Sequence, residues 1–355
     1  LTNVTGLAAL TANSAQDGST TLTLSNLPST LTTINMSDSG TSDTLAASFS
    51  SGPSALAVNA YALSNAATNI TSLNAPLTIS GKMLTTLTGT AQAYAASNIT
   101  TLGTMTTDAT AITIATDSLS AGIGLATTEF TIGTITDSVL ESFTVNGGAY
   151  SDLVVSTASI STGNTEFASV DLNVGAGGSL TVGKFVANSA TAVTFDVNVG
   201  AQGSLVLNSS ADTSFSAADV TVIGALGDQA SMTYGTNDSI IGTDIVSNTW
   251  TAGVGVGASG ANIVLPDVEV ATAGTGTIGA TSITSGIASF VEQTIGAATA
   301  PKTIGSVALK GSGHVAVTLG ATSAAASATT GAANQGNISA AAMTSPLATT
   351  LIDAS

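Results

Sequence analysis

The sequence predicts an all-β protein folded as a β-solenoid, a stack of short strands joined by Gly- and Asn-rich turns, in one or more segments. Three observations predict this fold class. Apolar and polar residues alternate over short runs, and part of the chain repeats at intervals of 25 to 27 residues. Small side chains also dominate the 355 residues, which include 38 Gly and only 4% aromatic residues. Repeats of this length made of short strands bury a narrow core between successive coils.

Alternating runs occur throughout the chain. Examples are 21–24, 77–79 and 315–319, where Leu, Ile or Val alternates with Thr or Ala. Runs of this kind, separated by Gly, Asn, Ser and Asp, are typical of short strands. The six Pro lie between the runs, as expected because Pro lacks the N–H group that a sheet ladder requires.

The clearest repeat lies in the middle of the chain. Segment 143–148 (FTVNGG) aligns with 170–175 (VDLNVG) and with 195–200 (FDVNVG), at offsets of 27 and 25 residues. The same offsets hold for a downstream leucine in each unit: Leu153, Leu180 and Leu205. Independent positions that shift together predict coils stacked one upon the next.

The regularity of the repeat divides the chain into three segments. We expect an irregular β-rich or solenoid segment over 1–135, regular coils over 136–320 and an Ala/Ser/Thr-rich segment over 321–355, with a helical turn at 339–343. No apolar run is long enough to predict a transmembrane helix. The chain begins at Leu1 without a signal peptide, which leads us to expect a processed or excised product.

The charged residues exclude several classes of function. The chain has four Lys, no Arg, one His and no Cys, and its net charge is -17. Four scattered cations cannot form the basic stripe that nucleic acid requires, and thiol chemistry and Cys-ligated metals are excluded. His314 is expected to be a corner or hairpin residue and Trp250 a core residue. The sequence therefore does not predict an enzyme.

Aligned aspartates predict a cation site. Asp171 and Asp196 occupy one position of the repeat, and Asp219 fits the same position if one residue is inserted. Carboxylates on adjacent strands repel each other unless they are hydrated, protonated or bridged by a cation, and calcium favours clustered oxygen ligands. We therefore predict calcium as a cofactor, with solvated surface carboxylates as the alternative. Acidic turns supply further candidate ligands: Asp38, Asp43, Asp228, Asp238 and Asp244.

Asn146, Asn173 and Asn198 also share one position of the repeat. Stacked amides can form a hydrogen-bonded ladder along the axis. The alternative is that each Asn is a solvated polar residue next to a turn. Either role is structural.

The rhythm apolar-x-x-apolar-x-apolar occurs in 140–146 (LESFTVN) and in 31–36 (LTTINM). Together with the Thr-, Ala-, Gly- and Ser-rich composition, it resembles the repeats of bacterial S-layer proteins of the Gram-negative, type I-secreted kind. The resemblance implies an extracellular β-solenoid that tiles into a lattice on the cell surface, with calcium at its contacts. The calcium-binding RTX nonapeptide of that group does not occur in this sequence, so no ligand residues follow from the resemblance.

We therefore expect a secreted structural protein that assembles with copies of itself into a surface layer or filament, with cell-surface polysaccharide as a further partner. An adhesin or autotransporter-like passenger, whose solenoid carries recognition loops, is the alternative. A β-helix enzyme acting on polysaccharides is a remote third reading, because such sites need basic residues and the four Lys are far apart in the sequence.

Overall fold

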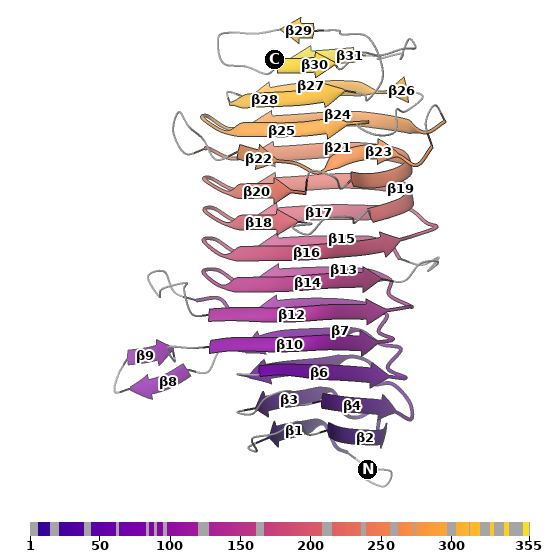
Figure 1. Cartoon of the computed structure of the whole chain (residues 1–355), viewed down its shortest axis with the longest axis vertical. Helices are drawn as coiled ribbons and strands as arrows, with labels where there is room; N and C mark the ends of the chain where they lie inside the picture. The colour runs from indigo at the N-terminus through magenta and orange to yellow at the C-terminus, as the bar shows by residue number, and fades with distance from the viewer. Residues whose placement is uncertain are drawn as a thin grey trace.

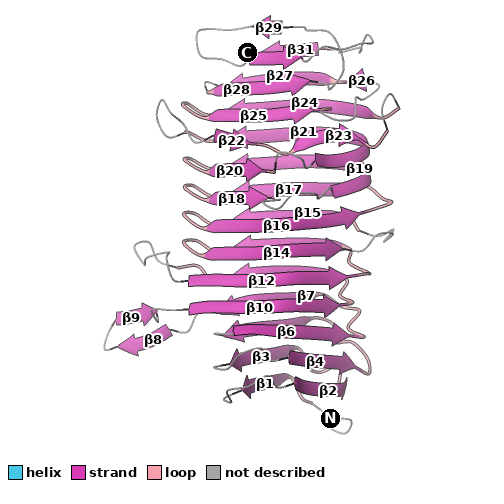
Figure 2. Cartoon of the chain, viewed as in Figure 1, coloured by secondary structure: helices cyan, strands magenta, loops and turns pink. Residues whose placement is uncertain are grey.

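The fold is seen in a computed structural model that describes residues 6–14, 21–38, 44–61, 64–82, 85–88, 91–94, 98–119, 128–160, 167–207, 215–235, 239–255, 262–272, 275–296, 303–311, 313–319, 327–329, 337–340 and 351–354. The prediction of an all-β solenoid is confirmed. Within these ranges the ordered elements are strands, without a helix (Figure 2). The strands stack along one axis from the N-terminal end to the C-terminal end (Figure 1).

Alternation of apolar and polar residues gives each strand a buried face and a solvent-facing one. In β15 (Ser169–Val174), for example, Val170, Leu172 and Val174 are buried and the residues between them are partly exposed. Only one face of such a strand has to be buried. In each coil, the apolar faces of the strands point toward one another and form a shared core.

The strands form two columns in which neighbours are parallel. The first column contains β1 (Ala9–Ser14), β3 (Thr33–Asp38), β5 (Leu56–Tyr61), β7 (Leu77–Lys82), β11 (Ala111–Thr116), β13 (Ser142–Gly147), β15, β17 (Val193–Val199), β19 (Phe215–Leu226), β21 (Ser239–Ala252), β24 (Thr277–Ser285), β27 (Ser306–Gly311) and β31 (Leu351–Ala354).

The second column contains β2 (Thr21–Leu27), β4 (Thr44–Phe49), β6 (Ser64–Thr71), β10 (Asn98–Thr107), β12 (Thr128–Asp137), β14 (Asp152–Ile160), β16 (Ser179–Asn188), β18 (Ser204–Leu207), β20 (Ser231–Tyr234), β22 (Asn262–Val264), β25 (Phe290–Ile295), β28 (His314–Leu319) and β30 (Asn337–Ala340). A third, shorter run of parallel pairs lies between the two columns: the end of β16 pairs with the start of β19, the start of β19 with the start of β21, and the start of β21 with the short strand β23 (Asp267–Val270). The short strand β26 (Thr303–Ile304) pairs with the first residues of β24.

Two elements are antiparallel. The hairpin β8 (Thr85–Thr88) and β9 (Ala91–Tyr94) projects from the side of the stack (Figure 1). At the C-terminal end, β29 (Ser327–Thr329) runs antiparallel to β30. The predicted helical turn at 339–343 is wrong at Ser339 and Ala340, which lie in β30, because strand pairing with β28 outweighs the helix propensity of the Ala-rich sequence.

The core is a set of inward rows that run along the stack. Phe143, Val170, Phe195 and Val222 are in register on successive strands, and each is at most 1% exposed. Each apolar side chain therefore packs against its equivalents in the neighbouring coils, which is why the repeat keeps apolar residues at these positions.

Glycines at the turns allow the coils to approach closely. The N–H groups of Gly175, Gly200 and Gly227 donate to carbonyls of the preceding coil at 2.7 to 2.8 Å. A Cβ atom on Gly200 would lie 2.7 Å from the backbone nitrogen of Ala176, which is closer than real Cβ contacts. Two residues after Gly200, Gln202 adopts the left-handed region with φ of 59°. Glycine is therefore required at these turns because a larger residue would push successive coils apart.

The prediction that Trp250 is a core residue is confirmed, since its side chain is 1% exposed. It follows Gly224 in register, and a Cβ atom on Gly224 would lie 2.0 Å from the indole ring. The indole N–H donates to Asn248 Oδ1 at 2.8 Å, and Asn248 Nδ2 donates to Gln293 Oε1 at 2.8 Å. Asn248 and Gln293 are 0% and 3% exposed, so this network joins β21 to β25 across the core.

Candidate functional site

The most regular polar surface lies on three consecutive strands of the first column, β13, β15 and β17. Their outward residues form two rows, because side chains along a strand alternate between faces. One row contains Thr144, Asp171 and Asp196, and the other contains Asn146, Asn173 and Asn198. The inward residues between these rows, Val145, Leu172 and Val197, are at most 1% exposed and fix the register.

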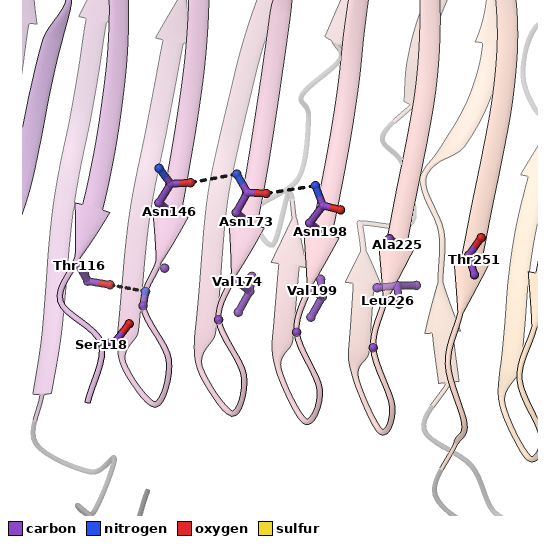
Figure 3. Close-up of a pocket in the computed structure, with 15 residues that line it drawn as sticks. Thr116, Ser118, Asn146, Asn173, Val174, Asn198, Val199, Ala225, Leu226 and Thr251 are labelled. Atoms are coloured by element: carbon purple, nitrogen blue, oxygen red, sulfur yellow. Dashed lines mark hydrogen bonds between the residues drawn. The ribbon is translucent and has the colours of Figure 1, made fainter. Parts of the chain in front are cut away.

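Of the two roles left open for the aligned asparagines, the structure shows the ladder. Asn173 Nδ2 donates to Asn146 Oδ1 at 2.9 Å, and Asn198 Nδ2 donates to Asn173 Oδ1 at 3.2 Å (Figure 3). The same contact occurs nearer the N-terminus, where Asn59 Nδ2 donates to Asn35 Oδ1 at 2.8 Å. Asn173 keeps one N–H group and one acceptor position beyond the ladder, and Asn146 keeps both N–H groups, so the row also presents hydrogen-bonding groups to a ligand.

Asp171 and Asp196 lie opposite each other on adjacent strands, as the repeat predicts. The hydroxyls of Thr144 and Ser169 donate to Asp171 Oδ2, each at 3.3 Å, and Asn198 Nδ2 donates to Asp196 Oδ1 at 3.2 Å. Partial burial and, next, the charge of Asp171 raise the pKa of Asp196. A cation bound between these two carboxylates would relieve their repulsion.

The prediction that Asp219 lies in the same row as Asp171 and Asp196 is wrong. The strand β19 continues the row with Ile223, which lies opposite Asp196 and is 42% exposed. Val220 pairs with Val193 and fixes this register, because a shift of one residue would turn the apolar side chains of β19 to solvent. Asp219 instead lies opposite Asp244.

The other predicted ligands are not brought to this surface. Only the backbone of Asp38 is described, at the end of β3, and Asp43 and Asp238 lie outside the described residues. Asp228 and Asp244 hydrogen-bond to backbone N–H groups of the next coil: Asp228 Oδ1 accepts from Val254 at 2.9 Å and Asp244 Oδ1 from Thr277 at 2.6 Å. These two carboxylates thus hold adjacent coils together.

The residues present fit a calcium ion in part. Asp171 and Asp196 would supply two carboxylates, and Thr144 and Ser169 would supply hydroxyl oxygens from the same surface. No group of three acidic, His or Cys side chains suited to a metal occurs in the part of the chain that the structure describes. A calcium ion at this pair would therefore need further oxygen ligands from water or from a second molecule.

An open groove of about 680 Å³ lies beside the asparagine ladder (Figure 3). It crosses several coils and is lined by the ladder amides, by Val174, Val199 and Leu226, and by turn glycines. None of the described residues that line it is charged. The groove offers amide hydrogen bonds and apolar surface, but no charged acid or base for catalysis.

Sequence reasoning missed a buried carboxylate at a corner of the stack. Asp137 is 1% exposed and accepts hydrogen bonds from the backbone N–H groups of Ala109 at 2.9 Å and Val139 at 2.8 Å. The carboxylate of Asp108 likewise accepts hydrogen bonds from the backbone N–H groups of Ser72 at 2.7 Å and Leu73 at 2.8 Å. The signal was available in principle, since Asp at the end of a strand often bonds to turn backbone.

The buried Asp137 predicts that stability depends on pH. Burial, opposed by the backbone hydrogen bonds and assisted by the charge of Asp108, raises the pKa of Asp137 from 3.8 to about 6. Protonation then favours the folded chain, so this contribution is fully present below the unfolded-state pKa and lost as the pH rises through about 6. Two pKa units correspond to roughly 2–3 kcal/mol. We expect urea titrations to give a free energy of unfolding that falls between pH 4 and 6, and falls less steeply in Asp137→Asn.

Asp244→Asn is the control for this pH effect. Hydrogen bonds from the hydroxyl and backbone of Thr277 lower the pKa of Asp244, so its contribution is present at neutral pH and is lost as the pH falls. Asp244→Asn should therefore leave the decrease between pH 4 and 6 in place. An unchanged pH slope in Asp137→Asn would contradict the burial of an acid at this corner.

No protein-family model, curated protein or solved structure matches the chain. Over the residues that the structure describes, no helix has the length and hydrophobicity needed to cross a bilayer.

Proposed function

We propose that the protein is a secreted structural component that assembles side by side with copies of itself into an extracellular surface layer or filament, with calcium at some contacts. The observation that carries this proposal is the long outward face of the first column, which carries few charged residues. Its outward row through Thr144 consists mostly of small side chains over many coils: Thr78, Thr113, Asp171, Asp196, Ile223, Thr249 and Ser282.

A face of this kind favours lateral contact between rods. Small side chains on parallel strands present little relief, so two faces can approach over many coils and bring only a few charged groups into the contact. Between Thr78 and Ser282, Asp171 and Asp196 are the acidic residues of this row, and Asp353 follows in register at its C-terminal end. Because the chain carries 21 acidic residues and only four Lys, divalent cations from outside are suited to bridge acidic groups of neighbouring rods.

Electron microscopy of the full chain with calcium, and after EDTA, tests the proposal. Ordered sheets or filaments are expected with calcium, and EDTA is expected to disperse them. The double variant Asp171→Asn/Asp196→Asn should require more calcium for assembly, whereas Asp228→Asn, which lies outside the row, should assemble normally. Assembly that EDTA does not affect would contradict the calcium contact, and monomeric protein under all conditions would contradict the proposed function.

The projecting hairpin supports a second candidate function, that of an adhesin whose solenoid carries a recognition element. The strands β8 and β9 extend from the side of the stack between β7 and β10 (Figure 1). Replacement of residues 85–94 by a short Gly-Ser linker should abolish binding to a glycan array in this case, and should leave a purely structural protein able to assemble.

A further inference from the structure

We infer that an uncharged, extended oligosaccharide binds along the groove beside the asparagine ladder. This groove opens on the outer face of the first column, next to the turns that end its strands (Figure 3). Such a ligand gives the rod a partner other than its own copies, and its binding does not require that the rods assemble.

The groove runs along the axis of the stack. The residues that line it come from six successive strands of the first column, β11, β13, β15, β17, β19 and β21, or from the turns that follow them. At ~4.8 Å per strand, the five intervals between these strands cover about 24 Å. A ligand that uses this length must be extended, because a compact molecule would contact only a few coils.

The floor of the groove is apolar. It contains a row of glycines from four neighbouring turns: Gly148, Gly175, Gly200 and Gly227. Their N–H groups all donate hydrogen bonds inside the protein, and the side chains of Val174, Val199 and Leu226 line the groove beside them. The C–H faces of sugar rings suit such a floor. An added peptide strand would find none of these N–H groups free to pair with its carbonyls.

The amide ladder supplies polar groups along the same groove (Figure 3). Beyond the ladder bonds, Asn173 keeps one N–H group, Asn146 keeps both, and Asn198 Oδ1 remains an acceptor. The ladder fixes the orientation of these amides before a ligand arrives, so binding does not have to order them. Hydroxyl groups both donate and accept. A sugar chain can therefore pair with donors and acceptors that recur from coil to coil.

Charge disfavours the competing classes of ligand. None of the described residues that line the groove is charged, and Asp171 and Asp196 lie in the neighbouring outward row. With a net charge of -17, the chain repels acidic polysaccharides and nucleic acids. A purely apolar ligand would leave the free amide N–H groups without partners, which costs binding free energy. An uncharged chain that is rich in hydroxyl groups avoids both penalties.

Isothermal titration calorimetry of the full chain in EDTA tests the inference, because EDTA removes calcium-dependent contacts between rods. The probes are two uncharged oligosaccharides, cellohexaose and mannohexaose, and the anionic hexamer of galacturonic acid. We expect an uncharged probe to bind, and the anionic probe to bind more weakly by roughly 10-fold or more. Replacement of residues 85–94 by a Gly-Ser linker should leave this binding unchanged, because the hairpin does not line the groove.

Asn173→Ala should weaken binding of the uncharged probe by roughly 10-fold. The substitution removes the free groups of Asn173 and both of its ladder bonds. Asn59→Ala is the matched control, since it breaks the same kind of bond, to Asn35 Oδ1, at a place that does not line the groove. Both variants lose ladder bonds, but only Asn173→Ala should lose affinity.

Ala225→Asn tests the geometry by a gain of binding. Ala225 is exposed, lines the groove and lies opposite Asn198 in register. An asparagine at this position extends the ladder by one amide and should strengthen binding by roughly 3- to 10-fold. Ala225→Val adds volume without an amide, so it should give no such gain.

Four results would overturn the inference. They are no binding of either uncharged probe, equal or tighter binding of the anionic probe, equal losses in Asn59→Ala and Asn173→Ala, and loss of binding when the hairpin is replaced. Circular dichroism of each variant establishes that its strands are intact. Rods that form calcium-dependent sheets but bind no oligosaccharide would overturn this inference alone. Rods that bind the probe but never assemble would contradict the proposed function alone.

Discussion

Replacing Trp250 with alanine is expected to lower the free energy of unfolding by about 3–5 kcal/mol. The indole is 1% exposed and packs over Gly224, which has no side chain to fill the space that alanine would leave. The substitution also removes the N–H group that donates to Asn248 Oδ1 at 2.8 Å. Chemical denaturation followed by circular dichroism measures the change, since Trp250 is the only Trp of the chain and its fluorescence is lost.

Two further variants separate packing from hydrogen bonding. Trp250→Phe keeps most of the ring and loses the donor, so it should cost about 1–2 kcal/mol. Gly224→Ala should destabilise the wild type by overpacking, about 1–3 kcal/mol, and should cost less in the Trp250→Ala background, where the space is free. A cost for Trp250→Ala within about 0.5 kcal/mol, as at an exposed position, would contradict the packing of the indole over Gly224.

Replacing Gly200 with alanine is the second substitution with a large expected effect. The Cβ atom would lie 2.7 Å from the nitrogen of Ala176 and 3.0 Å from the carbonyl carbon of Gly175, both in the backbone of the preceding coil. Backbone atoms cannot rotate away as a side chain can, so relief requires separation of the coils and weakens the bond from Gly200 N to Val174 O. We expect a loss of about 3 kcal/mol, the upper end for overpacking.

The neighbouring residue provides the control for Gly200. Ala201 is exposed in the same turn, so Ala201→Ser should change the free energy of unfolding by less than about 0.5 kcal/mol. Both variants are measured by urea denaturation at a single pH, to exclude the contribution of Asp137. Equal stability of Gly200→Ala and wild type would show that the coils are not in contact at this turn.

Sequence reasoning was most successful where successive coils have nearly the same length. The units at 143, 170 and 195 differ by only two residues in spacing, so rows of equal residues could be aligned without a structure. This regularity is why the alignment of the three asparagines and the pairing of Asp171 with Asp196 were predicted correctly, although the sequence left open whether the asparagines form a ladder.

The prediction failed where a strand turns a corner or bulges. In β19, one strand continues across a corner, and its register with β21 shifts between Val220 and Thr221. The alignment of Asp219 with Asp196 assumed one inserted residue, and no local signal fixes where an insertion lies. The hydrogen bond between Asn248 and Gln293 also could not be predicted from the sequence, because the two residues are 45 positions apart and meet only across the core.

In-register stacking makes the coil, and not the whole chain, the unit in which this protein can lengthen or shorten over evolution. Residues at equivalent positions of β13, β15 and β17 meet equivalent neighbours, so a duplicated copy of 170–194 would find matching surfaces above and below. Duplication of a gene segment would then extend the core, the ladder and the outer face together. Rod length in such a protein is therefore a heritable quantity that can vary without a new fold.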